Sequence, residues 1–227
     1  FTGGEPTINP DLFKYIEAAA GLGFDTVALE TNGMMFSYPQ FADRIAASAV
    51  SDVSVLLVSH RGDVSDGITR KPGGQELACR GIEAVCGRGM AVSIRVPLLP
   101  ETYAELAGLV RFAAERFSGV ERVEPFLPGR TGGSRAVSPE DLEPALVEAH
   151  DTAREAGVAL RFCEGAVVAP CLLQNPERIY SIFHFPPRED LHCGEEGFDA
   201  VCAGCFLRYY CPGIHPTHRG NSPGDRT

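Results

Sequence analysis

The sequence is poor in basic residues and has no long apolar run. Its 227 residues contain 20 lysines and arginines against 30 aspartates and glutamates, which gives a formal net charge of −10. Because a nucleic-acid backbone is bound by a basic surface, this balance argues against a nucleic acid as the main partner. No apolar stretch is long enough to span a bilayer, so we expect no membrane partner.

Motifs of several common enzyme classes are also missing. The sequence has no Gly-x-Ser-x-Gly elbow and no phosphate-binding Walker loop. The Gly132-Gly133 pair does not fit a dinucleotide-binding fingerprint in its strand–helix context. Asp63 and Asp66 predict a solvated acidic loop rather than a cation site. The candidate chemistry therefore lies in two other places, the first residues of the chain and its cysteine-rich end.

Helical and strand patterns alternate through most of the chain. Apolar periodicity and capping residues predict helices over residues 10–20, 39–49, 75–86, 103–117 and 138–156. Short apolar runs predict strands over residues 26–29, 53–58, 91–96, 123–126 and 158–162. One strand–helix pair per roughly 30 to 40 residues is the size of a βαβ unit. We therefore predict an α/β fold with a parallel sheet or partial barrel, its strands buried on both faces.

The chain opens with a stretch that favours ligand binding, Phe1-Thr2-Gly3-Gly4-Glu5-Pro6-Thr7. Two adjacent glycines allow backbone angles that other residues avoid and a close approach of a ligand. Pro6 restricts Glu5 to an extended conformation. We predict a strand end and a bare-backbone turn that lead into a helix. The Glu5 carboxylate would accept hydrogen bonds from a ligand ammonium.

Eight cysteines are present, and six of them follow residue 160. They are Cys79, Cys86, Cys163, Cys171, Cys193, Cys202, Cys205 and Cys211. The Cys-x-x-Cys spacing lets two thiolates reach one metal centre, and four thiolates suit either zinc or an iron–sulfur cluster. A disulfide framework fits an acidic α/β body less well, so we expect a reducing, cytoplasmic location. The spacing of Cys79 and Cys86 on one helix indicates core cysteines.

The Gly3-Gly4-Glu5-Pro6 string resembles the GGEP motif of the radical S-adenosylmethionine (SAM) enzymes. The resemblance covers nearly the whole chain and implies a partial TIM barrel of the (β/α)6 type. It also implies that these four residues bind the methionine ammonium of SAM. Asn32, Ser59 and His60 fall where members of this family line the SAM cleft, although an exposed His60 without a role is an equal alternative.

Two further features have open interpretations within the same resemblance. Arg95 lies in an otherwise apolar strand, where it would point into the barrel. There it would bind a carboxylate or form an ion pair with Glu30. The glycine-rich loop Pro128–Gly133 would approach the adenine of SAM or serve only as a flexible connection.

The cysteine-rich end resembles the SPASM or twitch-like extensions of radical SAM enzymes, whose Cys-x2-Cys-x5-Cys motif helps hold auxiliary 4Fe–4S clusters. The match falls on Cys202, Cys205 and Cys211. A full SPASM motif has another cysteine where this chain has His215, so we predict one auxiliary cluster. The resemblance makes Cys171 the expected fourth ligand, and the alternatives are Cys193 and Cys163.

One motif of the family is missing from these residues. The CxxxCxxC loop that holds the SAM-cleaving cluster normally precedes GGEP, and the chain begins at Phe1. We expect an N-terminally truncated sequence whose residues alone do not cleave SAM. The expected organisation is a barrel over residues 1–162, a cluster-binding extension over 163–219 and a disordered tail over 220–227.

The resemblance implies reductive cleavage of SAM to a 5′-deoxyadenosyl radical that abstracts hydrogen from a peptide or small-molecule substrate. It also implies an electron donor such as a ferredoxin or flavodoxin. An alternative is a non-catalytic barrel remnant whose zinc-stabilised tail binds a partner or peptide. A nucleic-acid-modifying member of the family is a third hypothesis, which the acidic charge balance disfavours.

Overall fold

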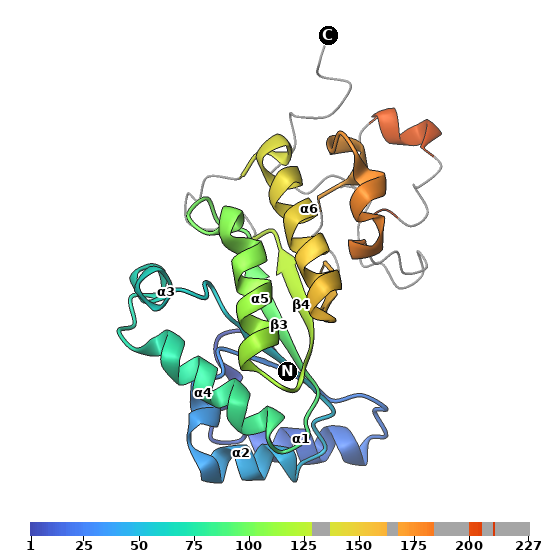
Figure 1. The fold of residues 1–227 in the computed structure, drawn as a ribbon. Helices are drawn as coiled ribbons and strands as arrows, with labels where there is room; N and C mark the ends of the chain where they lie inside the picture. The colour runs from blue at the N-terminus through green and yellow to red at the C-terminus, as the bar shows by residue number, and fades with distance from the viewer. Residues whose placement is uncertain (129–136, 163–167, 184–199, 206–210, 212–227) are drawn as a thin grey trace. The chain divides into compact units, whose positions relative to one another are not determined.

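A parallel five-stranded sheet forms the centre of the computed structural model (Figure 1). The structure describes residues 1–128, 137–162, 168–183, 200–205 and 211. The strands follow one another in space in chain order, and the pairs β1–β2 and β2–β3 are parallel. They are β1 (Ala28–Thr31), β2 (Asp52–Leu56), β3 (Val92–Pro97), β4 (Val120–Phe126) and β5 (Ala159–Leu160). Each overlaps a predicted strand, so the predicted α/β class is confirmed.

In the sequence α1 precedes β1, and the other α-helices fall between successive strands. They are α1 (Leu12–Gly21), α2 (Pro39–Ala46), α3 (Gly62–Thr69), α4 (Gly74–Cys86), α5 (Leu106–Arg116) and α6 (Pro139–Ala156). Short 3₁₀ turns are η1 (Pro6–Ile8), η2 (Met34–Ser37), η3 (Tyr103–Glu105), η4 (Pro170–Leu172), η5 (Pro176–Ile182) and η8 (Ala200–Gly204). Five helices were predicted and are confirmed. The sixth, α3, lies in a segment that we predicted to be a polar loop.

The two faces of the sheet differ in polarity. On the first three strands, Leu29, Val53, Val55 and Ile94 are at most 1% exposed and point to one face. Because side chains alternate along a strand, the neighbouring positions form the opposite face, which carries polar and charged residues. The prediction of strands buried on both faces is therefore wrong for β1 and β2, whereas β3 is buried on both faces at every position except Arg95. An apolar outer face and a polar inner face fit the wall of a partial barrel.

The chain begins in a strand-like conformation beside β1. The Phe1 amino group donates to the Ala28 carbonyl at 2.7 Å, and the Glu30 N–H donates to the Phe1 carbonyl at 2.9 Å. This is the hydrogen-bond pattern of two parallel strands. The prediction that a strand ends just before the glycine loop is thus supported by the backbone.

The chain divides into two compact units. The first comprises Phe1–Val96, Gly108–Val123 and Ala156–Ala159, and it contains the glycine loop. The second comprises Pro97–Ala107, Glu124–Glu155 and Leu160–Thr227. The predicted domain boundary at residue 162 stays a prediction.

Close backbone packing joins η2 to α4 in the first unit. Gly33 precedes η2 with φ +75°, and a Cβ at this residue would lie 2.6 Å from Val55 Cγ1. Gly81 of α4 lies directly against the same turn, because a Cβ built there would be 2.1 Å from the Gly33 carbonyl oxygen. Only a glycine at residue 81 allows this approach of the helix to the turn.

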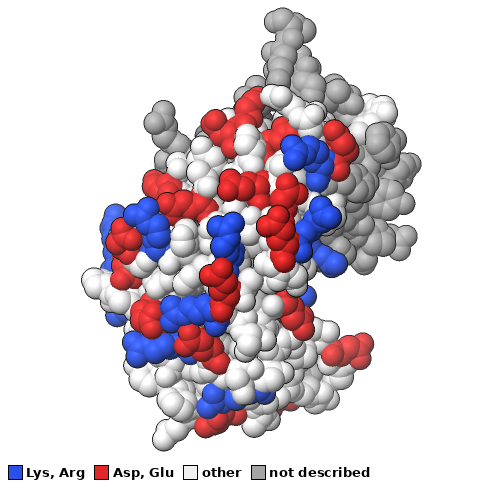
Figure 2. Space-filling model, in the orientation of Figure 1, with Lys and Arg blue, Asp and Glu red and all other residues white. Residues whose placement is uncertain are grey.

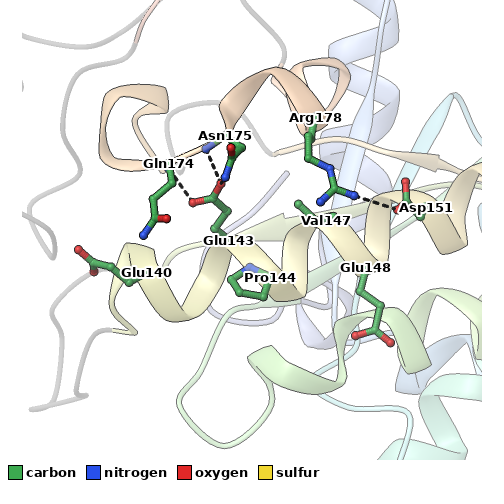
Figure 3. A pocket seen from close by; sticks show the side chains of 9 residues that line it. All are labelled: Glu140, Glu143, Pro144, Val147, Glu148, Asp151, Gln174, Asn175 and Arg178. Atoms are coloured by element: carbon green, nitrogen blue, oxygen red, sulfur yellow. Dashed lines mark hydrogen bonds and ion pairs between the residues drawn. The ribbon is translucent and has the colours of Figure 1, made fainter.

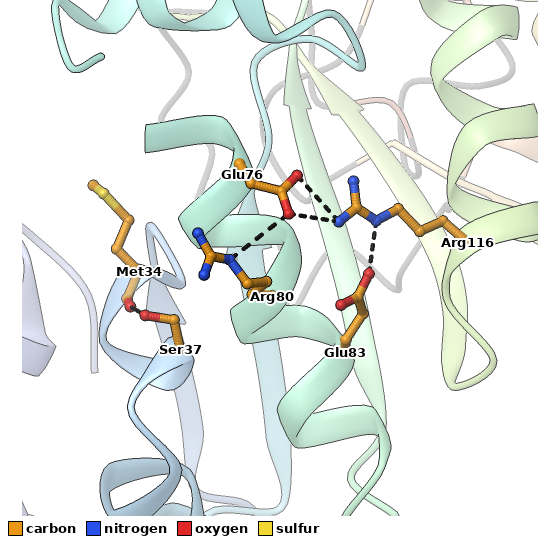
Figure 4. A network of polar contacts seen from close by, with 6 residues as sticks. All are labelled: Met34, Ser37, Glu76, Arg80, Glu83 and Arg116. Carbon is orange, nitrogen blue, oxygen red and sulfur yellow. Dashed lines mark hydrogen bonds and ion pairs between the residues drawn. The ribbon is translucent and has the colours of Figure 1, made fainter. Parts of the chain in front are cut away.

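A network of charged side chains joins α4 to α5 (Figure 4). Arg116 donates from Nε to Glu83 at 2.7 Å and from Nη2 to both Glu76 oxygens at 3.2 Å. Arg80 adds a longer ion pair to Glu76 at 3.7 Å. Burial disfavours the Arg116 cation, but these bonds outweigh it and raise its pKa. The network ties two neighbouring helices of the outer layer.

The charge distribution on one face and the character of the described helices can be compared with the composition. On the face drawn in Figure 2, acidic and basic side chains of the described residues are intermixed. None of the helices that the structure describes combines the length and apolar character needed to cross a membrane.

Candidate functional site

The glycine loop presents an open stretch of backbone. Gly3 has φ +84° and Gly4 has φ +55°, so both adopt the left-handed region that favours glycine. A Cβ at either residue would meet no atom within 4 Å. The glycines are therefore needed for the backbone angle rather than for packing, and their peptide groups face open space. A ligand can approach this backbone closely.

The carboxylate of Glu5 fixes the end of this loop. Its Oε1 accepts hydrogen bonds from Thr7 N at 3.0 Å, Thr7 Oγ1 at 2.6 Å and Thr31 Oγ1 at 2.6 Å. Its Oε2 accepts from Asn32 N at 2.7 Å. Glu5 thus caps η1 and also holds the carboxyl end of β1 to the loop. Among the described residues Oε1 accepts three hydrogen bonds and Oε2 accepts one, so Oε2 is the oxygen with more room for a ligand donor.

The turn after β1 is shaped by its own side chains. Asn32 Oδ1 accepts from Met34 N at 2.9 Å, and Thr31 Oγ1 accepts from Gly33 N at 3.2 Å. The predicted site residues Gly3, Gly4, Glu5 and Asn32 are therefore brought together. This cluster lies at the carboxyl end of β1, where parallel α/β folds place their ligand sites.

Two ion pairs cross the polar face of the sheet. Arg95 of β3 pairs with Glu30 of β1, which confirms one of the two predicted roles of Arg95. Arg122 of β4 pairs with Asp52 of β2 at 2.9 Å. Each pair reaches over one intervening strand. In both pairs the two charges are engaged with each other on the inner face.

The structure places the other two predicted SAM-cleft residues differently. The ring of His60 packs beside α5, where a Cβ at Gly108 would lie 3.0 Å from His60 Cε1, and its centroid is 6.2 Å from that of Phe112. Ser59 is 2% exposed, and its hydroxyl accepts from the Arg61 N–H at 3.1 Å. These contacts are structural and give no support to a cofactor role for either residue, which stays a prediction.

The predicted metal ligands are only partly described. Cys202 and Cys205 lie on one turn, closed by a hydrogen bond from Cys205 N to the Cys202 carbonyl at 3.2 Å. Within the described ranges, no three His, Cys, Asp or Glu residues gather closely enough to hold a metal ion. The positions of Cys171 and Cys211 therefore do not yet fit a cluster. Cys163, Cys193 and residues 129–133 lie outside the described residues.

Of the two helical cysteines, Cys79 is a core residue and Cys86 is half-buried. Cys79 is fully buried, and burial raises the pKa of its thiol to about 11. Burial also raises the pKa of Cys86, which packs against Gly119. Protonated thiols are poor metal ligands, so the prediction of core cysteines agrees with this environment.

The second unit contains a groove that sequence analysis did not predict (Figure 3). Its volume is about 490 Å³. It is lined by Glu140, Glu143, Pro144, Val147, Glu148, Asp151, Gln174, Asn175 and Arg178. Glu143 is 7% exposed, and its two oxygens accept from the N–H groups of Gln174 and Asn175, each at 2.6 Å. Glu143 thus fastens the segment that follows Cys171 to α6.

Sequence analysis also missed the partners that make the site. Thr7, Thr31 and Thr2 were not singled out, although all three hydroxyls donate to site carboxylates. The threonine two residues after Glu5 was a usable signal, because short-range bonds from threonine to an acidic cap are common in turns. Thr31 had no such signal, since it lies 26 residues from Glu5.

With this geometry established, comparisons with known proteins decide the family. The family model described as the radical SAM superfamily matches residues 1–113. The chain belongs to the radical SAM superfamily. Enzymes of this superfamily use SAM and an iron–sulfur cluster, which agrees with the GGEP resemblance.

Two curated relatives support this assignment. The chain is 33% identical over 150 residues to a "Probable GTP 3',8-cyclase" of Methanopyrus kandleri, covering 65% of this chain and 47% of that protein. It is 30% identical over 131 residues to the "Mycofactocin maturase MftC" of Mycobacterium tuberculosis, covering 57% and 32%. The chain thus spans about half or less of the length of these relatives.

Solved structures of the superfamily share the fold. A domain of a pyruvate-formate lyase-activating enzyme from Bacteroides vulgatus superposes with a TM-score of 0.58 at 18% identity, covering 72% of this chain and 96% of that one. Streptococcus suis SuiB, solved with SAM bound, gives 0.57 at 18% identity and coverages of 71% and 37%. The predicted partial TIM barrel of the radical SAM type is confirmed.

Proposed function

We propose that this chain forms the SAM-binding wall of a radical SAM enzyme. The observation that carries the proposal is the joining of the open Gly3-Gly4 backbone to the carboxyl end of β1 through Glu5. In this arrangement the remaining acceptor capacity of Glu5 and the exposed peptide groups receive the methionine amino group of SAM. Pro6 and the Thr7 bonds keep the carboxylate oriented before the ligand arrives.

The chemistry of the bound cofactor is reductive cleavage of SAM, which yields methionine and a 5′-deoxyadenosyl radical. The protein residues bind, orient and shield the reactants. Glu5 and Asn32 hold one end of SAM at the edge of the sheet. An electron donor such as a ferredoxin or flavodoxin supplies the reducing electron.

The substrate class in this proposal is a peptide or a small precursor. Similarity to a maturase supports a peptide, and similarity to a nucleotide cyclase supports a small precursor. We keep a cytoplasmic location as part of the same proposal.

An auxiliary 4Fe–4S cluster on Cys171, Cys202, Cys205 and Cys211 completes the proposal. The spacing of the last three cysteines and the shared turn of Cys202 and Cys205 support it. The alternative, a zinc-stabilised non-catalytic module, makes a different prediction for metal content. The two proposals are separated by measuring iron, sulfide and zinc after anaerobic purification. The proteins compared are the product of the complete reading frame and its Cys202→Ser, Cys205→Ser double variant. Loss of iron and sulfide in the variant supports the cluster, and zinc without iron supports the module.

The SAM site itself is tested by ligand binding. We expect the product of the complete reading frame, reconstituted with iron and sulfide, to bind SAM and to release 5′-deoxyadenosine on reduction. The Glu5→Gln variant should bind SAM at least about tenfold more weakly, because hydrogen bonds to a charged group contribute roughly 1.5–3 kcal/mol. Equal affinity in both proteins would remove Glu5 from the site.

A further inference from the structure

The carboxylate of Glu30 is held from two sides. Thr2 Oγ1 donates a hydrogen bond to Glu30 Oε2 at 2.8 Å, and Arg95 Nη1 pairs with Oε1. The Arg95 side chain is 20% exposed and that of Glu30 is 38% exposed, so the pair is partly shielded from water. Three segments far apart in the sequence thus meet on the polar face, at the beginning of the chain, on β1 and on β3.

Thr2 is the residue immediately before the two glycines. Because Gly3 and Gly4 have no neighbouring atoms within 4 Å of a Cβ position, packing does not fix their conformation. The loop is instead held at its two ends. Glu5 anchors the far end through Thr31 and Asn32. The near end has the Phe1 backbone bonds to β1 and the Thr2 hydroxyl bond to Glu30.

We infer that Thr2, Glu30 and Arg95 form a positioning chain that sets the conformation of the glycine loop for SAM. Arg95 orients the Glu30 carboxylate, and Glu30 in turn holds Thr2. The inference rests on the proposed SAM-binding function. All three are positioning residues, since they act on SAM through the loop.

The second ion pair on the same face provides a matched comparison. Arg122 and Asp52 also pair across an intervening strand, and their side chains are each 31% exposed. This pair joins β2 to β4, whereas the Glu30 pair leads through Thr2 to the loop. Removing the Arg122–Asp52 pair therefore eliminates an ion pair of similar exposure and leaves the contacts of the glycine loop unchanged. Asp52→Asn is therefore the control for Glu30→Gln.

The experiment combines amide exchange with SAM binding in the product of the complete reading frame. Hydrogen–deuterium exchange is followed by mass spectrometry in peptides that cover residues 1–9 and 120–126, without SAM, in wild type and variants. We expect Glu30→Gln and Thr2→Val to accelerate exchange in residues 1–9 at least about threefold, as loss of one hydrogen bond implies. Thr2→Ser keeps the hydroxyl and should match wild type. Arg95→Met should also accelerate exchange in residues 1–9, because the Glu30 carboxylate would no longer be oriented for its bond with Thr2.

SAM affinity is the second measurement. We expect the dissociation constant for SAM to rise about three- to tenfold in Thr2→Val and Glu30→Gln, and to stay within twofold in Asp52→Asn and Thr2→Ser. Thr2 is exposed, so Thr2→Val keeps the fold even if Glu30→Gln does not. If both loop variants match Asp52→Asn in exchange and in affinity, the positioning chain is wrong. If wild type fails to bind SAM while exchange still rises, the proposed function falls and the positioning of the loop stands.

Discussion

The Glu5 carboxylate accepts the backbone N–H of Asn32 at 2.7 Å, which joins residues 27 positions apart in the sequence. Through this bond and the Thr31 hydroxyl bond, the loop before η1 and the turn after β1 form one rigid edge. The acidic residue of the GGEP string is therefore structural before it meets any ligand. Its role as a cap and its proposed role as a ligand acceptor are separable by measurement.

Replacement of Glu5 by Gln is expected to destabilise the protein even without ligand. The side-chain amide would direct N–H groups at donors that now face a carboxylate, and up to four hydrogen bonds would be weakened. We expect the free energy of unfolding to fall by about 2–3 kcal/mol. Urea denaturation measures it. Glu17→Gln, an exposed carboxylate on α1, is the control and should change stability by less than about 0.5 kcal/mol. Equal stability of the two variants would show that the Glu5 bonds do not form in solution.

Two glycine-to-alanine substitutions should change the free energy of unfolding in opposite directions. Gly81→Ala places a methyl group 2.1 Å from the Gly33 carbonyl oxygen, so the helix must move away from the turn. We expect a loss of about 2 kcal/mol or more in the free energy of unfolding, as in overpacked cores. Gly67→Ala lies on the exposed side of α3 with no atom within 4 Å, and helix propensity predicts a gain of about 0.5–1 kcal/mol. Thermal unfolding of both variants provides the test, and a neutral Gly81→Ala would contradict the close packing.

The buried thiol of Cys79 predicts a loss of stability at alkaline pH. Burial raises its folded-state pKa from 9.0 to about 11, so above pH 9 the unfolded chain loses the proton first. Stability from this group is complete below pH 9 and declines as the pH rises to about 11. The decline amounts to about 2 kcal/mol for two pH units. Cys79→Ala should lack this part of the pH dependence in denaturation curves measured between pH 8 and 11. Identical slopes would mean that the thiol ionises freely.

Two of the four carboxylates that line the groove of the second unit should affect stability differently when replaced. Glu143 is buried and accepts two backbone N–H groups at 2.6 Å, so Glu143→Gln should reduce stability by about 2–3 kcal/mol. Glu148 is exposed on the same helix, and Glu148→Gln should stay within about 0.5 kcal/mol of wild type. Limited proteolysis near residues 174–175 measures the local effect. Similar cleavage rates in both variants would rule out the fastening role of Glu143.

The alternation of strands and helices was predictable because it depends on local patterns. Helix α5, for example, shows its buried stripe of Leu106, Leu109 and Val110 directly in the sequence. Helix α3 was missed because its eight residues include two glycines and few apolar side chains. The position of α3 is fixed by contacts with residues outside the helix rather than by an apolar pattern of its own. The carboxylate of Asp66 accepts the N–H groups of Gly73 and Gln75 and thereby joins α3 to the start of α4.

The candidate site was predictable only in its chemically distinctive residues. The glycines and Glu5 form a recognisable string, and an arginine in an apolar strand indicated the Glu30 pair. The direction of His60 was not predictable, because it depends on Gly108, which lies on a helix 48 residues later and leaves room for the ring. The alternation of polarity across the sheet was misjudged for a similar reason. Ser54 and Ser93 lie between apolar neighbours, and short strands conceal the polar face.

The most direct test is the release of 5′-deoxyadenosine from SAM by the product of the complete reading frame, reconstituted with iron and sulfide and reduced without oxygen. We predict that wild type forms 5′-deoxyadenosine and that Glu5→Gln forms at least about tenfold less at limiting SAM. A preparation that carries its full complement of iron yet neither binds SAM nor forms 5′-deoxyadenosine would contradict the account.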